Sequence, residues 1–256
     1  MEIKEIQASL IIQYLLHLGD TALIMSHRNG EWCGHGPALE QDIALTNIAL
    51  DQIGQARNFY QYAATLISES TNEKITEDSL AYHRDAWDFK NCLLAELPNG
   101  DWAQTILKQF LMSAYQYYLY LELQNAGDEQ LAAIATKSVK ELNYHLRWSA
   151  DWVIRLGDGT IESKIRMNEA IDQLWNYTSE LFEVADYENL LELETLVKIR
   201  EVWNEKIKIV FEEATLKIPS SGWRQKGGKQ GVHTEHLGFI LAEMQFLQRA
   251  YPGAEW

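Results

Sequence analysis

The stretch KELNYHLRW, Lys140 to Trp148, indicates what kind of helical protein this chain encodes. A carboxylate-bridged di-iron helix bundle uses the pattern Glu-x-x-His, because residues three apart lie one turn apart and point the same way. His145 is in place, but the residue three before it is Leu142, and Glu141 stands four before it. The stretch is therefore either a metal helix in an altered register or a metal helix without its metal.

The rest of the chain has the pattern of an all-α protein. No proline interrupts the sequence between Pro98 and Pro219, and apolar residues recur at the helical spacing of three and four. Long helices joined by short connections predict an up-and-down bundle with additional flanking helices, in one domain over residues 1–256. After a first helix that ends near a glycine-rich loop at 28–37, we expect helices over about 39–67, 80–95, 102–125, 129–156, 161–184, 193–216 and 234–250.

Composition excludes several classes of protein. The chain has 256 residues, is 46% apolar and carries a formal net charge of −15, so it can bury a sizeable core and would be repelled by the phosphates of nucleic acid. Its two cysteines cannot form a disulfide framework. The acidic N-terminus is unlike a signal peptide, and we expect no segment that is apolar for long enough to span a bilayer. The simplest interpretation is a cytoplasmic protein without a membrane or nucleic-acid partner.

The histidines rule out the usual di-iron ligand pattern. A di-iron bundle needs two Glu-x-x-His pairs, and no histidine here has a glutamate or aspartate three residues before it. This absence is informative because the spacing follows from helix geometry. The seven histidines are His17, His27, His35, His83, His145, His233 and His236.

Two other histidine patterns leave alternatives open. Glu141 and His145 share a helix face, which favours a hydrogen bond or weak ion pair between them over a metal site in an altered register. His233 and His236 could contribute to a zinc site, but nothing nearby supplies a third ligand, so capping of a helix by Thr234 is favoured.

A basic cluster stands out on this acidic chain. Arg224, Lys226 and Lys229 lie in a glycine-rich stretch that does not match a phosphate-binding P-loop, because Gln230 follows the last lysine. The cluster is interpreted first as a solvated loop. The alternatives are contact with an acidic partner or with the phosphates of a ligand.

Two long segments carry a resemblance to a known family. LGDTALIMSHRNGEWCGHGPALEQDIALTNIALDQIGQARNFY (18–60) and GGKQGVHTEHLGFILAEMQFLQRAYPGAEW (227–256) resemble the C-subunit family of bacterial ring 1,2-phenylacetyl-CoA epoxidases, multicomponent oxygenases of aerobic phenylacetate degradation. The resemblance runs over nearly the whole chain. It implies a ferritin-like bundle that serves as a structural subunit and pairs with a homologous catalytic A subunit.

The same resemblance implies where the cofactors lie. The A subunit holds the di-iron centre and binds the acyl-CoA, while a separate reductase with flavin and an iron–sulfur centre supplies electrons. No cofactor is expected in this chain, which is predicted to be non-catalytic by itself. The B subunit and the reductase are further candidate partners.

The A-subunit motifs can be placed on this sequence residue by residue. A motif D-E-A-G-H corresponds to DQIGQ, so its glutamate and histidine fall on Gln52 and Gln55. A motif E-E-x-x-H corresponds to ELNYH, where Leu142 replaces the glutamate and His145 is kept. The first-helix glutamate falls near Ala22 and the remaining carboxylate near Ser113. The resemblance thus implies a former metal centre at Ala22, Gln52, Gln55, Ser113, Leu142 and His145.

A physical argument supports this interpretation. Buried carboxylates are tolerable only when a metal neutralises them, so a centre without metal must become apolar or neutral. His145 can remain as a neutral imidazole if Glu141, Gln52 or a backbone carbonyl accepts its N–H. Trp32, in the loop after the first helix, is expected either to anchor the partner or to close the loop as an ordinary core tryptophan.

Three alternatives to the interpretation as a structural member of an oxygenase remain. One is a free-standing metalloenzyme that uses Glu40, Asp42, Glu141 and His145. Another is a helical adaptor unrelated to oxygenation. The third is a direct contribution to acyl-CoA binding through the basic cluster.

Overall fold

The structure is a computed structural model that describes residues 3–190, 193–220 and 222–254, and the regular structure of these residues is helical throughout. Most predicted helices are present with ends close to those expected. The α-helices are α1 Ile3–Gly30, α2 Leu39–Thr71, α3 Glu77–Tyr82, α4 Leu93–Glu96, α5 Trp102–Leu123, α6 Glu129–Gly157, α7 Ile161–Leu174, α8 Leu193–Glu213 and α9 Glu235–Ala250. The 3₁₀ helices are η1 Ala86–Asp88, η2 Trp175–Phe182, η3 Asp186–Leu190 and η4 Gly228–Gln230.

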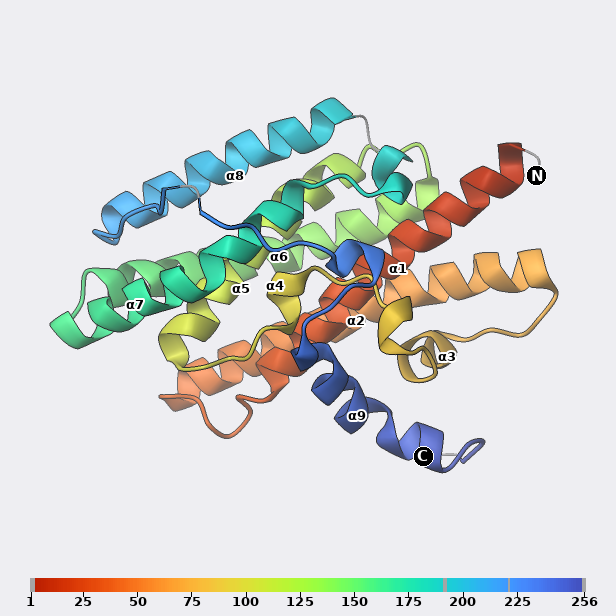
Figure 1. Cartoon of the computed structure of the whole chain (residues 1–256), viewed down its shortest axis with the longest axis horizontal. Helices are drawn as coiled ribbons and strands as arrows, with labels where there is room; N and C mark the ends of the chain where they lie inside the picture. Colours follow the sequence, from red (N-terminus) through yellow and green to blue (C-terminus); the bar gives the residue numbers. More distant parts are fainter. Residues whose placement is uncertain (1–2, 191–192, 221, 255–256) are drawn as a thin grey trace.

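Four long helices form the central bundle. Helices α1 and α2 pack along each other as one hairpin, α5 and α6 as a second, and α2 meets α6 across the middle. Helices α7 and α8 cover α5, while α9 packs on α3 and α4 at the edge of the bundle (Figure 1). This arrangement confirms the predicted all-α, ferritin-like bundle with additional flanking helices.

Two predicted helices differ from the structure. The helix expected over 161–184 is α-helical only as far as Leu174 and continues as the 3₁₀ helix η2. The stretch expected to be a helix over 80–95 consists of α3, η1 and α4, joined by extended chain. Two side chains of α1 hold this chain open: the carboxylate of Asp20 accepts the backbone N–H of Lys90, and the hydroxyl of Thr21 accepts that of Cys92. The local pattern is helical, but these tertiary hydrogen bonds satisfy the backbone in a different conformation.

Polar side chains define where most helices begin. Aspartate or threonine at the N-cap accepts a backbone N–H of the first turn, which satisfies a group that the helix leaves free. Such caps precede α3, α5, α6, α7 and α9, at Thr76, Asp101, Asp128, Thr160 and Thr234. The favoured interpretation of Thr234 as a helix cap is therefore confirmed.

Helix α1 contradicts the expectation about membrane-length segments. Its segment Ser9–Gly30 is long and apolar enough to cross a bilayer by length and composition alone. Of the 18-residue window that meets this criterion, however, 67% is buried inside the bundle, because α1 is a core helix packed against α2 and η3. Its apolar character reflects burial by protein on most sides.

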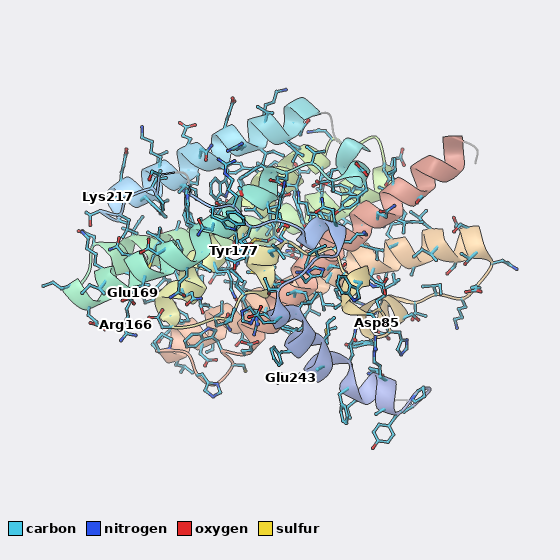
Figure 2. The ribbon with its side chains drawn as sticks, viewed as in Figure 1. Asp85, Arg166, Glu169, Tyr177, Lys217 and Glu243 are labelled. Carbon is cyan, nitrogen blue, oxygen red and sulfur yellow. The ribbon has the colours of Figure 1, made fainter. Side chains whose placement is uncertain are left out.

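Charged side chains lie mainly on the outside. Figure 2 shows Arg166, Glu169 and Lys217 at the outer edge of the molecule near α7. Arg166 pairs with Glu162 through its Nε atom and with Asp101 through its Nη1 atom. Exposed pairs of this kind contribute little to stability, so the fold depends on its core and on a small number of buried ion pairs.

A buried ion pair fixes the extended stretch between α3 and α4. Both oxygens of the fully buried Asp20 carboxylate bind the Arg84 guanidinium, and Tyr60 donates its hydroxyl to the same carboxylate at 2.5 Å. Arg84 also lies over the ring of Phe89, 4.3 Å from its centroid. Every donor and acceptor of the pair is used, so the interactions of the two charges offset the cost of removing them from water.

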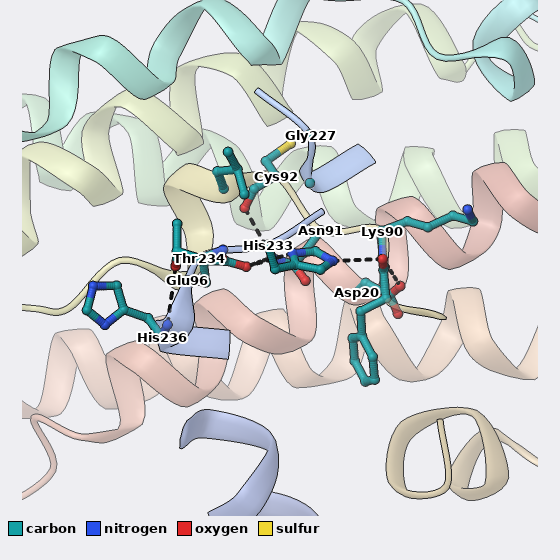
Figure 3. A network of polar contacts seen from close by, with 12 residues as sticks. Asp20, Lys90, Asn91, Cys92, Glu96, Gly227, His233, Thr234 and His236 are labelled. Carbon is teal, nitrogen blue, oxygen red and sulfur yellow. Dashed lines mark hydrogen bonds and ion pairs between the residues drawn. The ribbon is translucent and has the colours of Figure 1, made fainter. Parts of the chain in front are cut away.

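A second ion pair attaches the C-terminal segment to α4. His233 Nδ1 lies 2.9 Å from Glu96 Oε2, and its Nε2 lies 2.8 Å from the carbonyl oxygen of Phe89 (Figure 3). Both neighbours are hydrogen-bond acceptors, so the ring can donate to both of them only when it is protonated and positively charged. Burial lowers the pKa of His233, but Glu96 and the Phe89 carbonyl raise it more, and the pKa lies above its usual 6.5.

This ion pair predicts a stability that depends on pH. A raised folded-state pKa gives stabilisation that is fully present below the unfolded value near 6.5 and is lost as the pH rises through the folded value. At pH 6 we expect wild type to have a higher free energy of unfolding than His233→Gln. This difference should fall by about 1–3 kcal/mol between pH 6 and pH 9. Urea titrations at each pH measure this difference, with the exposed His35→Gln as control. Parallel pH curves for wild type and His233→Gln would contradict the assignment.

Candidate functional site: a neutral polar centre in the bundle

The residues at the expected former metal centre are all buried, and they lie on the four long helices. None is more than 1% exposed. They are Ala22 on α1, Gln52 and Gln55 on α2, Ser113 on α5, and Leu142 and His145 on α6. All six positions thus lie in the core, and their contacts decide what the centre can do.

A chain of neutral hydrogen bonds links three of these helices. The amide nitrogen of Asn29 donates to Gln52 Oε1 at 2.8 Å and to Gln109 Oε1 at 2.7 Å. Gln109 in turn donates to Ser113 Oγ at 2.8 Å. All four side chains are buried, and none carries a charge. Most amide and hydroxyl groups here satisfy one another, as buried polar groups generally do, but Asn29 Oδ1 is buried without a hydrogen-bond partner among the described residues.

Sequence reasoning missed Asn29 and Gln109. A signal for one of them was present, since Gln109 and Ser113 are polar residues four apart in the otherwise apolar run QFLMSAY. Two polar residues with this spacing share a helix face and can hydrogen-bond to each other. Asn29 gave no such signal, because its partners belong to α2 and α5 and become neighbours only when the bundle forms.

Glu141 and His145 do not bond to each other, contrary to the interpretation favoured from their spacing. Gln55 Nε2 donates to Glu141 Oε2 at 2.9 Å, while His145 Nε2 lies 2.9 Å from Asp51 Oδ2. Both side chains thus reach across to α2, where Asp51 and Gln55 are one turn apart. The acceptor expected for His145 was Glu141, Gln52 or a backbone carbonyl, and the structure corrects it to Asp51.

The environment of Glu141 is unfavourable for a negative charge. Burial raises the pKa of this carboxyl above its usual range, the hydrogen bond from Gln55 lowers it, and the nearby charge of Asp51 raises it again. The net shift is upward.

The residues present do not fit a di-iron centre. In the described part of the chain, no three or more histidine, cysteine, aspartate or glutamate side chains come together in a group that could hold a metal ion. Glu40 is exposed, and Asp42 accepts the backbone N–H of Gly36. The alternative metal site at Glu40, Asp42, Glu141 and His145 is therefore not assembled.

The basic cluster is divided by the fold. Arg224 and Lys226 are exposed, but Lys229 is 1% exposed and cannot contact a ligand or partner. Its Nζ binds both carboxylate oxygens of the buried Glu188, at 2.9 and 3.0 Å, and the carbonyl oxygens of Leu181 and Glu183. The expectation for Lys229 was wrong because its partners lie some forty residues earlier in the sequence, in η2 and η3 and the turn between them.

Trp32 packs against its own chain and remains partly exposed. Its indole N–H donates to Thr105 Oγ1 at 2.9 Å, and its ring meets that of Trp102 edge-on at 5.2 Å. Trp102 also contacts Trp148 and Trp152, so the loop after α1 closes over a cluster of tryptophans. These contacts give Trp32 a structural role in the loop, and its role as a partner anchor stays a prediction.

Two comparisons relate this chain to known proteins. The model of a family described as phenylacetic acid catabolic protein matches residues 2–256. The chain is also similar to the C subunit of 1,2-phenylacetyl-CoA epoxidase from Escherichia coli (strain K12). The two are 47% identical over 247 residues, which cover 95% of this chain and 98% of the relative.

The neutral centre predicts the effect of restoring a carboxylate. Leu142 is fully buried, so Leu142→Glu places a carboxyl in the core with no cation to neutralise it. We expect the free energy of unfolding to fall by several kcal/mol at pH 7, with partial recovery at low pH as the carboxyl becomes neutral. Urea unfolding measures this, and the exposed neighbour Asn143→Glu serves as control. Equal stability of the two variants would mean that Leu142 does not face the core.

Lys229 gives a second prediction about buried charge. Lys229→Met leaves Glu188 buried and without its cation, which should reduce the free energy of unfolding by about 3–5 kcal/mol. The matched control is Lys226→Met in the same loop, where an exposed lysine pairs with Glu183 at 3.6 Å, and we expect no measurable change. The double variant Lys229→Met, Glu188→Gln should regain part of the lost free energy of unfolding. Thermal and urea unfolding of the three variants check the prediction, which fails if Lys229→Met unfolds like wild type.

Proposed function

The chain belongs to the family of phenylacetic acid catabolic proteins, and from this premise we propose that it is a non-catalytic subunit of a multicomponent oxygenase that epoxidises the ring of phenylacetyl-CoA. Its task is to dock the homologous catalytic A subunit and to stabilise it. The name of the Escherichia coli relative supports the assignment to such an enzyme, and the docking role is argued from the structure.

The observation that carries the non-catalytic role is the neutral hydrogen-bonded centre. Asn29, Gln52, Gln109 and Ser113 occupy the middle of the bundle with amides and a hydroxyl. Neutral amides are poor ligands for iron compared with carboxylates and imidazoles. Activation of oxygen is therefore assigned to the A subunit, with its di-iron centre, and the supply of electrons to a reductase with flavin and an iron–sulfur centre.

The docking role rests on an exposed apolar stripe along α2. Leu39, Ile43, Leu50 and Ile53 are between 44% and 73% exposed. At 100° per residue these four positions lie within about 80° of one another, so they share one face of the helix. Exposed apolar residues scattered singly need no explanation, but a row of four on one face is typical of a surface that a partner covers.

Helix α9 offers a second apolar surface. Phe239 and Phe246 are 69% and 64% exposed and lie seven residues apart, hence on one face. An obligate interface commonly buries about 2,000–5,000 Å² and is strongly apolar, which two such surfaces could supply in part. The B subunit and the reductase are proposed as further members of the complex, which we place in the cytoplasm.

The test is association of this chain with its A-type partner when the two are produced together. Ile43 on α2 and Ile209 on α8 are both 52% exposed, so substitution of each by aspartate makes a matched pair. We expect Ile43→Asp to raise the dissociation constant of the pair at least about 30-fold, because it leaves an unpaired charge in an apolar interface. Ile209→Asp should leave it unchanged.

Analytical ultracentrifugation or surface plasmon resonance measures the dissociation constant. Circular dichroism checks that both variants are folded. Equal weakening by the two variants would mean that α2 is not the docking face. Wild-type chains that do not associate with an A-type partner at all would overturn the docking role itself.

A further inference from the structure

A small cavity lies between η2, α8 and the loop that follows α8. Its volume is about 160 Å³. The loop is tied to η2 by a hydrogen bond from the Gln225 backbone N–H to the carbonyl oxygen of Asn176, at 2.9 Å. The side chains that matter for its chemistry are Trp175, Phe182, Arg200, Trp203, Trp223 and Arg224.

The aromatic part of the cavity is held rigidly. Trp203 is 2% exposed and donates its indole N–H to the carbonyl oxygen of Leu111 at 3.1 Å, which fixes the plane of its ring. Trp175 and Phe182 pack against it, with ring centroids 6.0 and 5.3 Å away. Trp223, by contrast, is 77% exposed although it lines the same cavity. Three rings thus form a preorganised wall, and a fourth stands at the rim.

The polar part of the cavity is positive and without acidic partners. Arg200 and Arg224 form no ion pair or hydrogen bond with any residue the structure describes, although the chain has 37 acidic residues. Arg200 is exposed to solvent, and its guanidinium lies over the face of Phe182, 6.0 Å from the ring centroid. Ser179 also lines the cavity, and its Oγ is buried without a hydrogen-bond partner among the described residues.

The size of the cavity limits what can bind. A volume of 160 Å³ is close to that of an engineered protein cavity of about 150 Å³ that holds benzene. Sites for larger cofactors and drug-sized ligands measure about 300–1,000 Å³, so a nucleotide does not fit. The two unpaired guanidinium groups disfavour a cation and suit a carboxylate, which arginine binds through two parallel hydrogen bonds.

We propose that this cavity is a binding site for a monocyclic aromatic carboxylate. The aromatic ring of the ligand packs against Trp175, Phe182 and Trp203, while its carboxylate pairs with Arg200 and Arg224 at the mouth. The site is separate from the neutral centre and from the apolar stripe on α2, so the inference does not depend on the docking role. It gives this chain a binding activity of its own.

Binding of phenylacetate to the purified full-length chain tests the proposal, with acetate, benzyl alcohol and inorganic phosphate as comparison probes. A ligand of this size is expected to bind with a dissociation constant on the order of 0.1–1 mM. Tryptophan fluorescence and ligand-observed NMR measure it. Acetate, benzyl alcohol and phosphate should each bind at least about tenfold more weakly, because each lacks either the ring or the carboxylate.

Variants locate the binding. Arg200→Gln and Arg224→Gln should each weaken binding about tenfold or more, and Trp223→Ala should weaken it less. The matched control is Arg147→Gln on α6, an exposed arginine outside the cavity, which should bind as wild type does. No saturable binding up to about 10 mM phenylacetate, equal affinity for acetate or phosphate, or equal affinity of the Arg224→Gln and Arg147→Gln chains would each overturn the proposal.

Discussion

The free-energy cost of placing a charge inside a protein governs the centre of this molecule. A di-iron bundle can hold several carboxylates in its core because the cations neutralise them, and the same positions without metal must be apolar or neutral. Here Gln52, Gln109 and Ser113 are joined through Asn29 into a chain of neutral hydrogen bonds. Leu142 and Ala22 are fully buried in the hydrophobic core. The four long helices come together without a group of side chains that could hold a metal ion among the described residues.

The same constraint explains how the outer segments are held. Ion pairs with buried members lie away from the centre, and further hydrogen bonds complete each of them: Asp20 with Arg84, Lys229 with Glu188, and His233 with Glu96. Each pair joins segments that are far apart in sequence, and together they fasten the extended stretch after α3 and the C-terminal segment to the bundle. Satisfied pairs of this kind specify one arrangement of segments, since any other arrangement would leave a charge alone.

Several features of the surface suit contact with other molecules. The apolar stripe on α2 and the exposed phenylalanines of α9 suit contact with another protein. The cavity beside α8 differs from both, because it combines rigid aromatic rings with unpaired arginines. These three features lie on different helices, so association with a partner and binding of a small acid can be altered independently by mutation.

The helices and the loss of the metal motif could be read from the sequence. Both depend on spacing within one segment, such as the apolar period, the absence of proline from 99 to 218, and the missing Glu-x-x-His at Leu142. The partners of His145 and Lys229 could not be read in this way, because Asp51 and Glu188 come close only after distant helices have packed. The extended chain near Lys90 was likewise decided by Asp20 on α1. Local spacing determines each helix by itself, and only the packing of helices determines which buried polar group meets which.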